Sequence, residues 1–475
     1  ISGNFSVQEA TNLAILLRSG ALPVDITILE ERTVGPGLGA DSIAAGEIAA
    51  LIGAFAVIVF MIASYGFFGV LAVVALALNV LMLFAILSVL QATLTLPGIA
   101  GIILCLGIAV DSNILIFSRI REETAKGASA IKALTQGYAR AWSTILDANI
   151  TTLLAMVLLF MFGAGAIRGF AITMSLGILI SMFTAVVLMR MMMEALVRRR
   201  KPARLAIAPL LGGVPTPGAF AFMRRKRLAL AVSAALSLGA VTALVVPGPT
   251  LGIDFTGGVQ MTLAAPEPIP LAGLRAAVAG FGDAALQSFG TPNEALLRLQ
   301  GEAGQATVTA LSAAVRAVMP DVSFAAIDLV GPTISGELAL TGAIALGAAV
   351  LAMLAYIWLR FEWHFAAAAI LVLGLDVTLT LGVIALAGWE VNLPAVVAML
   401  TLTGYSVNDK VVVFDRVREN LMRVQKVPFP ALVDQSLNQV LARCIFTSGT
   451  TLAAVIPMAV GGGAAVAGFA WPMLA

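Results

Sequence analysis

The sequence has few charged residues for its length. Lys, Arg, Asp and Glu make up 11% of the 475 residues, whereas apolar residues make up 60%. A soluble globular protein carries about 25% charged residues, because its surface must face water. The composition therefore excludes a water-soluble fold and predicts a membrane protein. The net charge of +2 is the small difference between 28 basic and 26 acidic residues, and it gives no indication of nucleic-acid binding.

Cysteine and histidine are also scarce. Cys105 and Cys444 lie in apolar segments far apart in the sequence, and His364 is the only histidine. This excludes a disulfide framework, a CxxC metal site and a histidine-cluster metal site. The glycine-rich segment 252–258 lacks the Lys-Ser/Thr of a phosphate-binding loop. We find no nucleophile–base arrangement either, so we expect neither enzyme activity nor a cofactor or metal.

Long apolar runs dominate the sequence instead. A membrane-spanning helix needs about 20 mostly apolar residues. Ten segments meet this requirement: 44–63, 67–90, 95–117, 142–162, 169–193, 228–246, 338–359, 364–387, 393–414 and 442–461. A further apolar run begins near Gly463 and stops at Ala475, too short to span. Because the sequence begins at Ile1 without a signal peptide, we expect a fragment of a longer protein with up to 12 spans.

Basic residues gather in three segments, 119–140, 198–227 and 416–426. By the positive-inside rule these segments are cytoplasmic, so 1–43 and 247–337 lie on the outer side. The predicted domains follow from the spans. They are the end of an outer domain (1–43), a bundle of five spans (44–197), a basic cytoplasmic linker (198–227), a single span (228–246), a small outer domain (247–337) and a second bundle (338–475).

The segment 247–337 reads as a small α+β domain. Alternating apolar residues predict strands at 259–263, 285–289, 295–299 and 322–327. Helical patterns at 271–279 and 306–318 separate them. This order of elements predicts a ferredoxin-like sandwich.

The two halves of the sequence repeat each other at an offset near 297 residues. Leu96-Pro97 recurs as Leu393-Pro394, and Val34-Gly35-Pro36 as Val330-Gly331-Pro332. Phe117-x-Arg119-x-Arg121-Glu122 recurs as Phe414-x-Arg416-x-Arg418-Glu419, and Thr151-Thr152 as Thr450-Thr451. Two halves in the same orientation predict a mainly α-helical protein of two pseudo-symmetric bundles, related by an axis along the membrane normal. Such symmetry is typical of transporters.

Two acidic residues lie inside equivalent spans of the repeat. Asp111 aligns with Asn408, and Ser112 aligns with Asp409. A charged group inside the bilayer costs about 3 kcal/mol or more, and intramembrane acids often mark proton relays. The alternative is a hydrogen bond that joins two helices. A pair of acids on repeat-related helices favours the relay.

Other polar residues in the spans have several interpretations. Arg443 could be a charge partner of Asp409, although its position alone favours a side chain that snorkels from a helix end. The rest we interpret as hydrogen-bonding groups that hold helices together; they are Asp376 and its repeat mate Asn79, the neighbours Asn113 and Asn408 of the two acids, and the cluster of Asp147, Asn149, Thr151 and Thr152.

Long motifs resemble the SecD/SecF family of bacterial protein-export membrane proteins. The first half resembles SecD in TLTLPGIAGIILCLGIAVDSNILIFSRIREE, DANITT and AIRGFA. The second half resembles SecF in GIDFTGG, LTGYSVNDKVVVFDRVREN and FTSGTT. The resemblance covers nearly the whole chain. Of the family's full pattern, we expect the first span and most of the large SecD-type outer domain to be missing from this sequence.

The resemblance implies an auxiliary of the Sec translocon, in the resistance-nodulation-division superfamily of proton-driven proteins. Inward proton flow would help to pull a preprotein from the SecYEG channel on the periplasmic side of the bacterial inner membrane. By matching motifs, Asp111 and Asp409 would be the proton-carrying acids and Arg443 the partner of Asp409. The translocon and the preprotein are the expected partners, YajC and YidC are further candidates, and nucleic acid is not expected.

One residue departs from the family pattern, and two other functions compete. Lys410 stands after Asn-Asp, where the family usually has Thr or Ser. It could compete with Arg443 for Asp409, or it could snorkel toward the cytosol. An exporter of drugs or lipids from the same superfamily would carry far longer outer insertions. A translocon scaffold without transport activity stays open, and proton flux would distinguish it.

Overall fold

The computed structural model describes residues 30–163, 165–203, 205, 207, 220–282, 284–289, 291–301, 303–423 and 427–475. It divides into two compact units, one of Ile1–Thr33 with Gly257–Ile334 and one of Val34–Thr256 with Ser335–Ala475. The body of the predicted N-terminal outer segment, residues 1–29, lies outside the described residues, as do Arg204 and Lys426 of the basic segments.

The larger unit is a bundle of long apolar helices. Within the described residues, ten are long and apolar enough to cross a membrane. Those of the first half are α2 (Pro36–Tyr65), α3 (Phe67–Val89), α4 (Leu96–Ala125), α5 (Ala130–Phe162) and the continuous span Ala166–Arg200, built from α6 (Ala166–Phe183), a π-helical turn (Thr184–Leu188) and α7 (Met189–Arg200). Those of the second half are α8 (Lys226–Val245), which follows a 3₁₀ turn (Met223–Arg225), α12 (Pro332–Arg360), α13 (Trp363–Ala387), α14 (Leu393–Arg423) and α15 (Phe429–Gly461). All ten predicted spans are confirmed.

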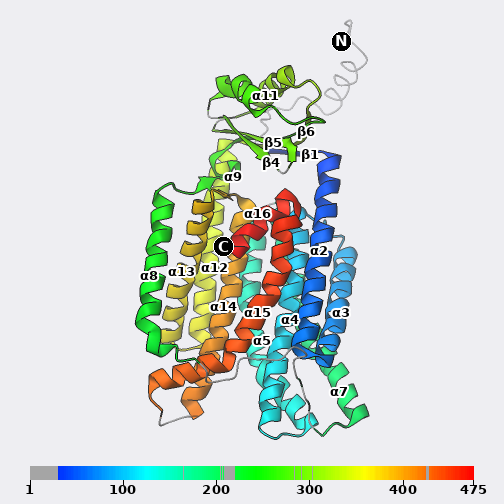
Figure 1. Ribbon diagram of the computed structural model, residues 1–475, viewed down its shortest axis with the longest axis vertical. Coiled ribbons are helices and arrows are strands. Elements are labelled where there is room, and N and C mark those ends of the chain that lie inside the picture. Colours follow the sequence, from blue (N-terminus) through cyan, green and yellow to red (C-terminus); the bar gives the residue numbers. More distant parts are fainter. Residues whose placement is uncertain are drawn as a thin grey trace, which may run out of the picture. The chain divides into compact units, whose positions relative to one another are not determined.

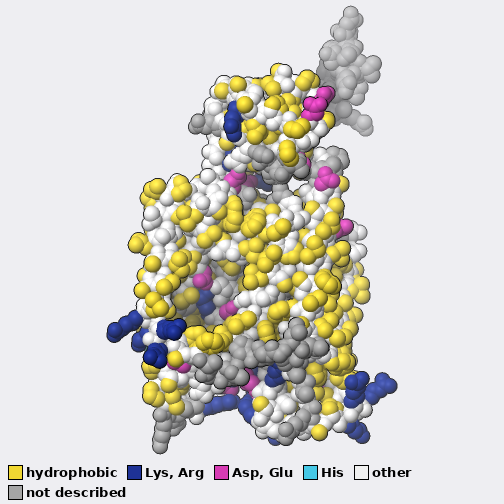
Figure 2. All heavy atoms as spheres, viewed as in Figure 1, with side chains coloured by type: hydrophobic (Ala, Val, Ile, Leu, Met, Phe, Trp, Pro, Cys, Tyr) yellow, Lys and Arg dark blue, Asp and Glu magenta, His cyan; other side chains and the backbone are white. Residues whose placement is uncertain are grey.

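The short final helix, α16 (Gly463–Leu474), is too short to span, as expected. Figure 2 shows apolar side chains over most of the visible flank of this unit, which suits a surface that faces lipid. Figure 1 places the end of α7 and the start of α8 at one end of the bundle, where ion pairs also join the ends of α4 and α14. The three basic segments therefore share one end, whereas the side of the membrane on which that end lies stays a prediction.

The sequence repeat is visible in the helix boundaries. Leu96 begins α4 and Leu393 begins α14, each followed by a proline at the second helical position, where its missing N–H costs nothing. Pro36 and Pro332 likewise begin the equivalent helices α2 and α12. The helices α4, α5, α14 and α15 form the centre of the bundle, with α5 packed on α14 and α4 packed on α15 (Figure 1).

Glycines at repeat-equivalent positions make both of these contacts close. A Cβ atom added to Gly107 of α4 would lie 3.4 Å from the backbone of Thr451 on α15. A Cβ atom added to Gly404 of α14 would lie 3.3 Å from the Cα of Thr152 on α5. The two halves of the bundle therefore meet twice with the same small-residue geometry, as transmembrane helices commonly do.

The smaller unit is a five-stranded sheet with two helices. Its elements are β1 (Glu30–Val34), β3 (Gly258–Ala264), α10 (Leu271–Val278), a 3₁₀ turn (Ala279–Phe281), β4 (Ala284–Phe289), β5 (Thr291–Gln300), α11 (Gln305–Val318) and β6 (Ser323–Val330). The strand order is β1-β6-β3-β5-β4, and β3 is antiparallel to both β5 and β6. The βαββαβ order of β3 to β6 confirms the ferredoxin-like prediction. The fifth strand, β1, was not predicted.

In the larger unit, a short strand pair and one hydrogen bond join the beginning of the glycine-rich segment 252–258 to the start of α14. Strand β2 (Thr250–Leu251) pairs in parallel with β7 (Glu390–Val391). In the short helix α9 (Ile253–Thr256), the buried carboxylate of Asp254 accepts a hydrogen bond of 2.9 Å from the backbone N–H of Leu393. Asp254 thus caps the helix that carries Asp409.

Candidate functional site

The carboxylate of Asp111 lies at the meeting point of the two halves. Asp111 is on α4, in the first half, and is only 7% exposed. Its Oδ2 accepts a hydrogen bond of 2.9 Å from Asn408 Nδ2 on α14, and its Oδ1 accepts one of 2.7 Å from Thr447 Oγ1 on α15. Asn408 is the residue with which the repeat aligns Asp111, so the equivalent positions also meet in space. Thr447 was not predicted as a site residue, although it lies in the motif FTSGTT, in the middle of α15.

Asp409 follows Asn408 on α14 and is half-buried. Its electrostatic neighbours are Asp111, Arg443 and Lys410, and the thiol of Cys444 lies beside it. Arg443, on α15, is itself buried rather than snorkelling from the helix end. Among the described residues, however, the ion pairs do not include one between Arg443 and Asp409. The arginine stands close enough to act on the acid without a direct salt bridge.

Lys410 is a second cation near Asp409, but its direct partner is a residue that the sequence did not indicate. Its ammonium group forms an ion pair of 2.6 Å with Asp376 Oδ2 on α13, and it also contacts Ser406 on its own helix. The prediction that Lys410 snorkels toward the cytosol is therefore wrong, because a carboxylate within the span is in reach. Lys410 still acts electrostatically on Asp409, but its direct partner is Asp376.

The predicted helix-joining residues behave differently from one another. Asp376 joins α13 to α14 through Lys410, and its mate Asn79 donates a hydrogen bond of 3.5 Å to Thr184 across α3 and the π-helical turn. Asn79 is buried, whereas about a third of the Asp376 side chain is exposed.

In the cluster on α5, Asp147 joins the two halves. It accepts hydrogen bonds from Tyr356 Oη at 2.7 Å and from Arg360 Nε at 2.8 Å, both on α12. The interhelical role expected of Asn149 and Thr151 is not seen, since both side chains bond to carbonyls of their own helix. Thr152 reaches the Gly404 carbonyl at 3.5 Å.

Two buried amide oxygens near the acids have no hydrogen-bond partner. They belong to Asn113, two residues after Asp111, and to Asn408, whose amide nitrogen bonds Asp111. Buried polar atoms are usually paired, and a water molecule commonly fills such a place. The region around Asp111 and Asp409 therefore offers acceptor groups that water could use.

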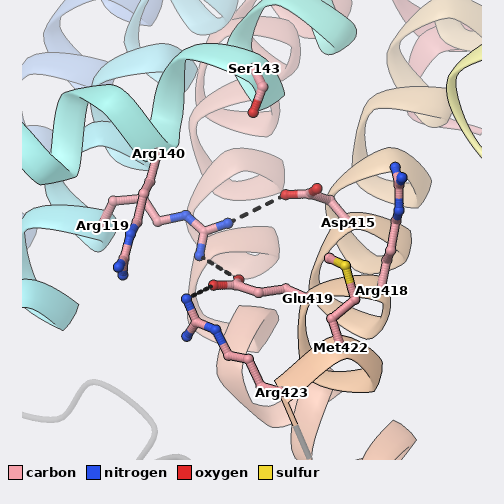
Figure 3. A pocket seen from close by; sticks show the side chains of 8 residues that line it. All are labelled: Arg119, Arg140, Ser143, Asp415, Arg418, Glu419, Met422 and Arg423. Carbon is pink, nitrogen blue, oxygen red and sulfur yellow. Dashed lines mark hydrogen bonds and ion pairs between the residues drawn. The ribbon is translucent and has the colours of Figure 1, made fainter.

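A network of ion pairs closes the same interface at the basic end of the bundle. Arg119 and Glu122 on α4 meet their repeat equivalents Arg416 and Glu419 on α14. Two ion pairs cross between the halves, Arg416 to Glu122 at 2.5 Å and Arg119 to Glu419 at 3.3 Å. The side chains of Arg119 and Arg416 are more than 90% buried. We call these four residues the ion quartet; Figure 3 shows two of them beside a pocket.

The side chains that meet at the centre of the bundle are of kinds that can exchange protons. In the described part of the chain, no group of three or more His, Cys, Asp or Glu side chains could hold a metal ion. What the central helices do bring together is two carboxyl groups, hydrogen-bond donors from the opposite half and one buried guanidinium group. Such a set can hold different numbers of protons as its hydrogen bonds rearrange.

Comparison with known proteins identifies the family. The family model described as "Protein export membrane protein SecD/SecF, C-terminal" matches residues 18–199 and 310–475. The chain belongs to the SecD/SecF family. A second model of this family, the SecD/SecF GG motif, matches residues 242–265. That segment contains Gly258, whose φ is +131° and whose added Cβ would lie 2.1 Å from the Leu299 carbonyl oxygen. Only glycine fits there without moving β5.

Named relatives agree with the family. The chain is 40% identical over 481 residues to the protein translocase subunit SecDF of Brucella abortus, an alignment that covers 99% of this chain and 62% of that protein. It is 55% identical over 207 residues to the subunit SecD of Magnetococcus marinus, with 44% of this chain and 39% of that protein covered.

Solved structures of SecDF share the fold. The crystal structure of SecDF from Thermus thermophilus, described as a translocon-associated membrane protein, matches with a TM-score of 0.89 at 36% identity. It covers 100% of this chain and 65% of the longer one. A SecDF in a "Super-membrane-facing form" matches with a TM-score of 0.75, and also at 36% identity, over 98% of this chain and 64% of that one. Like these relatives, the chain is a multi-pass inner-membrane protein, and it spans less than two-thirds of their length.

Proposed function

We propose that this chain is the membrane part of a SecDF-type auxiliary of the Sec translocon, driven by inward proton flow. It would promote translocation and release of preproteins on the periplasmic side. Membership of the SecD/SecF family supports the role in export, and the description of the Thermus thermophilus relative as translocon-associated supports the SecYEG channel as a partner. The observation that carries the proton part is the contact of Asp111 with both Asn408 and Thr447.

The physical link between protons and movement lies in those two hydrogen bonds. An ionised carboxylate only accepts hydrogen bonds, whereas a protonated carboxyl must also donate one. Hydrogen bonds to a charged group are also about twice as strong as those between neutral groups. A proton that arrives at Asp111 therefore weakens the attachment of α4 to α14 and α15. The two halves can then shift, and release of the proton restores the contact.

Arg443 and the pair of Asp376 with Lys410 have supporting roles in this scheme. The buried guanidinium of Arg443 favours one ionised carboxylate near it and so limits how many protons the pair of acids holds. Lys410, engaged by Asp376, keeps a second cation near Asp409. The interhelical contacts of Asn79 and Asp147 hold neighbouring helices together.

The energy available matches the task. One proton that crosses a potential of 100 mV releases about 2.3 kcal/mol. Shifting a two-state equilibrium from one extreme to the other needs about 5.5 kcal/mol. A few protons for each conformational cycle would therefore suffice.

Preprotein export in reconstituted vesicles tests this proposal. The vesicles contain the full-length protein and the translocon, with or without an imposed proton gradient. We expect the gradient to accelerate a late, ATP-independent stage of export with the wild type and not with Asp409→Asn. Glu47→Gln is the matched control, because it neutralises an exposed acid in another span, on α2, away from this cluster; it should keep the gradient response. If Asp409→Asn responds as the wild type does, the chain is better described as a translocon scaffold.

A further inference from the structure

A pocket of about 250 Å³ opens at the basic end of the bundle, where α4, α5 and α14 converge (Figure 3). Four arginines line it: Arg119, Arg140, Arg418 and Arg423. Since a water molecule takes up about 30 Å³ of liquid, the pocket has room for a phosphate-sized group and several waters. Nothing in the proposed proton function uses this space.

The two carboxylates in the pocket wall are already paired. Asp415 contacts Arg119 at 3.5 Å and accepts a hydrogen bond of 3.2 Å from Thr144. Glu419 is held by Arg416 at 2.7 Å and by Arg423 at 2.8 Å. With four arginines against two acids, the lining carries two excess positive charges. Beyond the lining, Glu123 pairs with Arg140 and Glu122 with Arg119. Arg418 is therefore the lining arginine that attracts an anion most directly.

Two donors in the pocket wall are not used by the protein's own acids. Arg418 forms no ion pair with a carboxylate among the described residues, and the hydrogen bond that it donates to the Arg360 carbonyl is long, 3.5 Å. The hydroxyl of Ser143 on α5 is exposed and makes no hydrogen bond in the described structure. Figure 3 shows this hydroxyl pointing toward the gap between Arg119 and Asp415. A guanidinium group and a hydroxyl are typical phosphate ligands.

Exposed apolar side chains surround this charged pocket. Trp142, the neighbour of Ser143 on α5, is 44% exposed, and Met422 on α14 lines the pocket while 69% exposed. Tryptophan is enriched where a membrane meets water, with its ring at the level of the lipid headgroups. Basic pockets between transmembrane helices at this level bind the headgroups of anionic lipids.

We propose that this pocket binds a phosphate group, and that the phosphate is that of an anionic phospholipid of the surrounding bilayer. Arg418 and Ser143 bind the phosphate oxygens, and the acyl chains lie along the apolar surface near Trp142 and Met422. Because Arg119 and Glu419 belong to the ion quartet, a lipid held here contacts the junction of the two halves.

Native mass spectrometry of the purified full-length protein tests the site with defined lipids. Phosphatidylglycerol and phosphatidylethanolamine are titrated separately, and inorganic phosphate is titrated in a third series. Ser143→Asp is the main variant, because it places a negative charge in the pocket without removing a bond that the protein makes. Arg418→Gln removes the principal cation. Arg198→Gln is the matched control, since Arg198 is an exposed basic residue at the end of α7, outside the pocket.

We expect the wild type to bind phosphatidylglycerol in preference to phosphatidylethanolamine. Ser143→Asp and Arg418→Gln should each weaken phosphatidylglycerol binding about tenfold, the effect of losing one charge-assisted contact, while Arg198→Gln should not. Equal binding by the wild type and both pocket variants would overturn the proposal. Binding of inorganic phosphate without phosphatidylglycerol would keep the phosphate site and overturn its assignment to a lipid. The melting temperature of Ser143→Asp is measured as well. If it equals that of the wild type, the weaker lipid binding is not caused by misfolding.

Discussion

Arg416 of α14 lies 2.5 Å from Glu122 of α4, and the residues to which the sequence repeat relates them, Arg119 and Glu419, are joined at 3.3 Å. The two ion pairs are equivalent under the repeat, because in each an arginine of one half binds a glutamate of the other half. Because the arginines are buried, removal of one partner leaves a charge that water can reach only poorly. The ion quartet is therefore a point at which the two halves are held in one relative position.

A double-mutant cycle on this pair measures the strength of that junction. Arg416→Met should destabilise the protein by about 1–3 kcal/mol, because Glu122 and Glu419 lose a buried partner. The second substitution, Glu122→Leu, should restore part of the loss, since it removes one of the unpaired acids. Thermal unfolding of the four proteins in detergent gives the coupling energy. Strictly additive losses would show that the pair does not interact.

The close approach of α14 to α5 makes Gly404 sensitive to size. Gly404→Leu should force the helices apart and cost about 1–3 kcal/mol, the usual effect of overpacking. Gly374→Leu on α13 is the matched control, because an added Cβ there has no neighbour within 4 Å. Unfolding temperatures compare the two, and equal temperatures would contradict the described packing at Gly404.

The cap that Asp254 provides to α14 can be tested in the same way. Asp254→Ala removes the acceptor of the Leu393 N–H, and loss of a helix cap typically costs about 1 kcal/mol. Protection of the first turn of α14 against hydrogen exchange should fall with it. Asp321→Ala, at an exposed position before β6, serves as control. Unchanged exchange in the first turn of α14 would show that Asp254 does not cap it.

Much of the membrane architecture could be predicted because length and hydropathy determine where a chain can span a bilayer. The proline that follows Leu96 and Leu393 indicated the start of two helices, and the structure begins α4 and α14 at those residues. The strands β3 to β6 were predictable because apolar residues alternate along them. Strand β1 was not, since Glu30–Val34 is an exposed edge strand with hardly any apolar alternation.

Contacts between helices could not be predicted from the sequence. The spacing of Lys410 gave its place on a helix but not the distance to Asp376, which depends on how α13 packs against α14. The same holds for Asp147, whose partners Tyr356 and Arg360 lie more than 200 residues away. The repeat did align Asp111 with Asn408, and those residues meet because both lie on the faces by which the two halves pack.

Proton movement through the cluster of Asp111 and Asp409 is the central claim, and flux into proteoliposomes tests it most directly. A pH-sensitive dye inside the vesicles reports proton entry after a potential is imposed across the full-length protein. We predict flux with the wild type, none above that of protein-free vesicles with Asp111→Asn or Asp409→Asn, and flux retained by Glu47→Gln, the exposed acid of α2. Flux of the wild-type size in both single variants, or no flux in the wild type, would contradict the account.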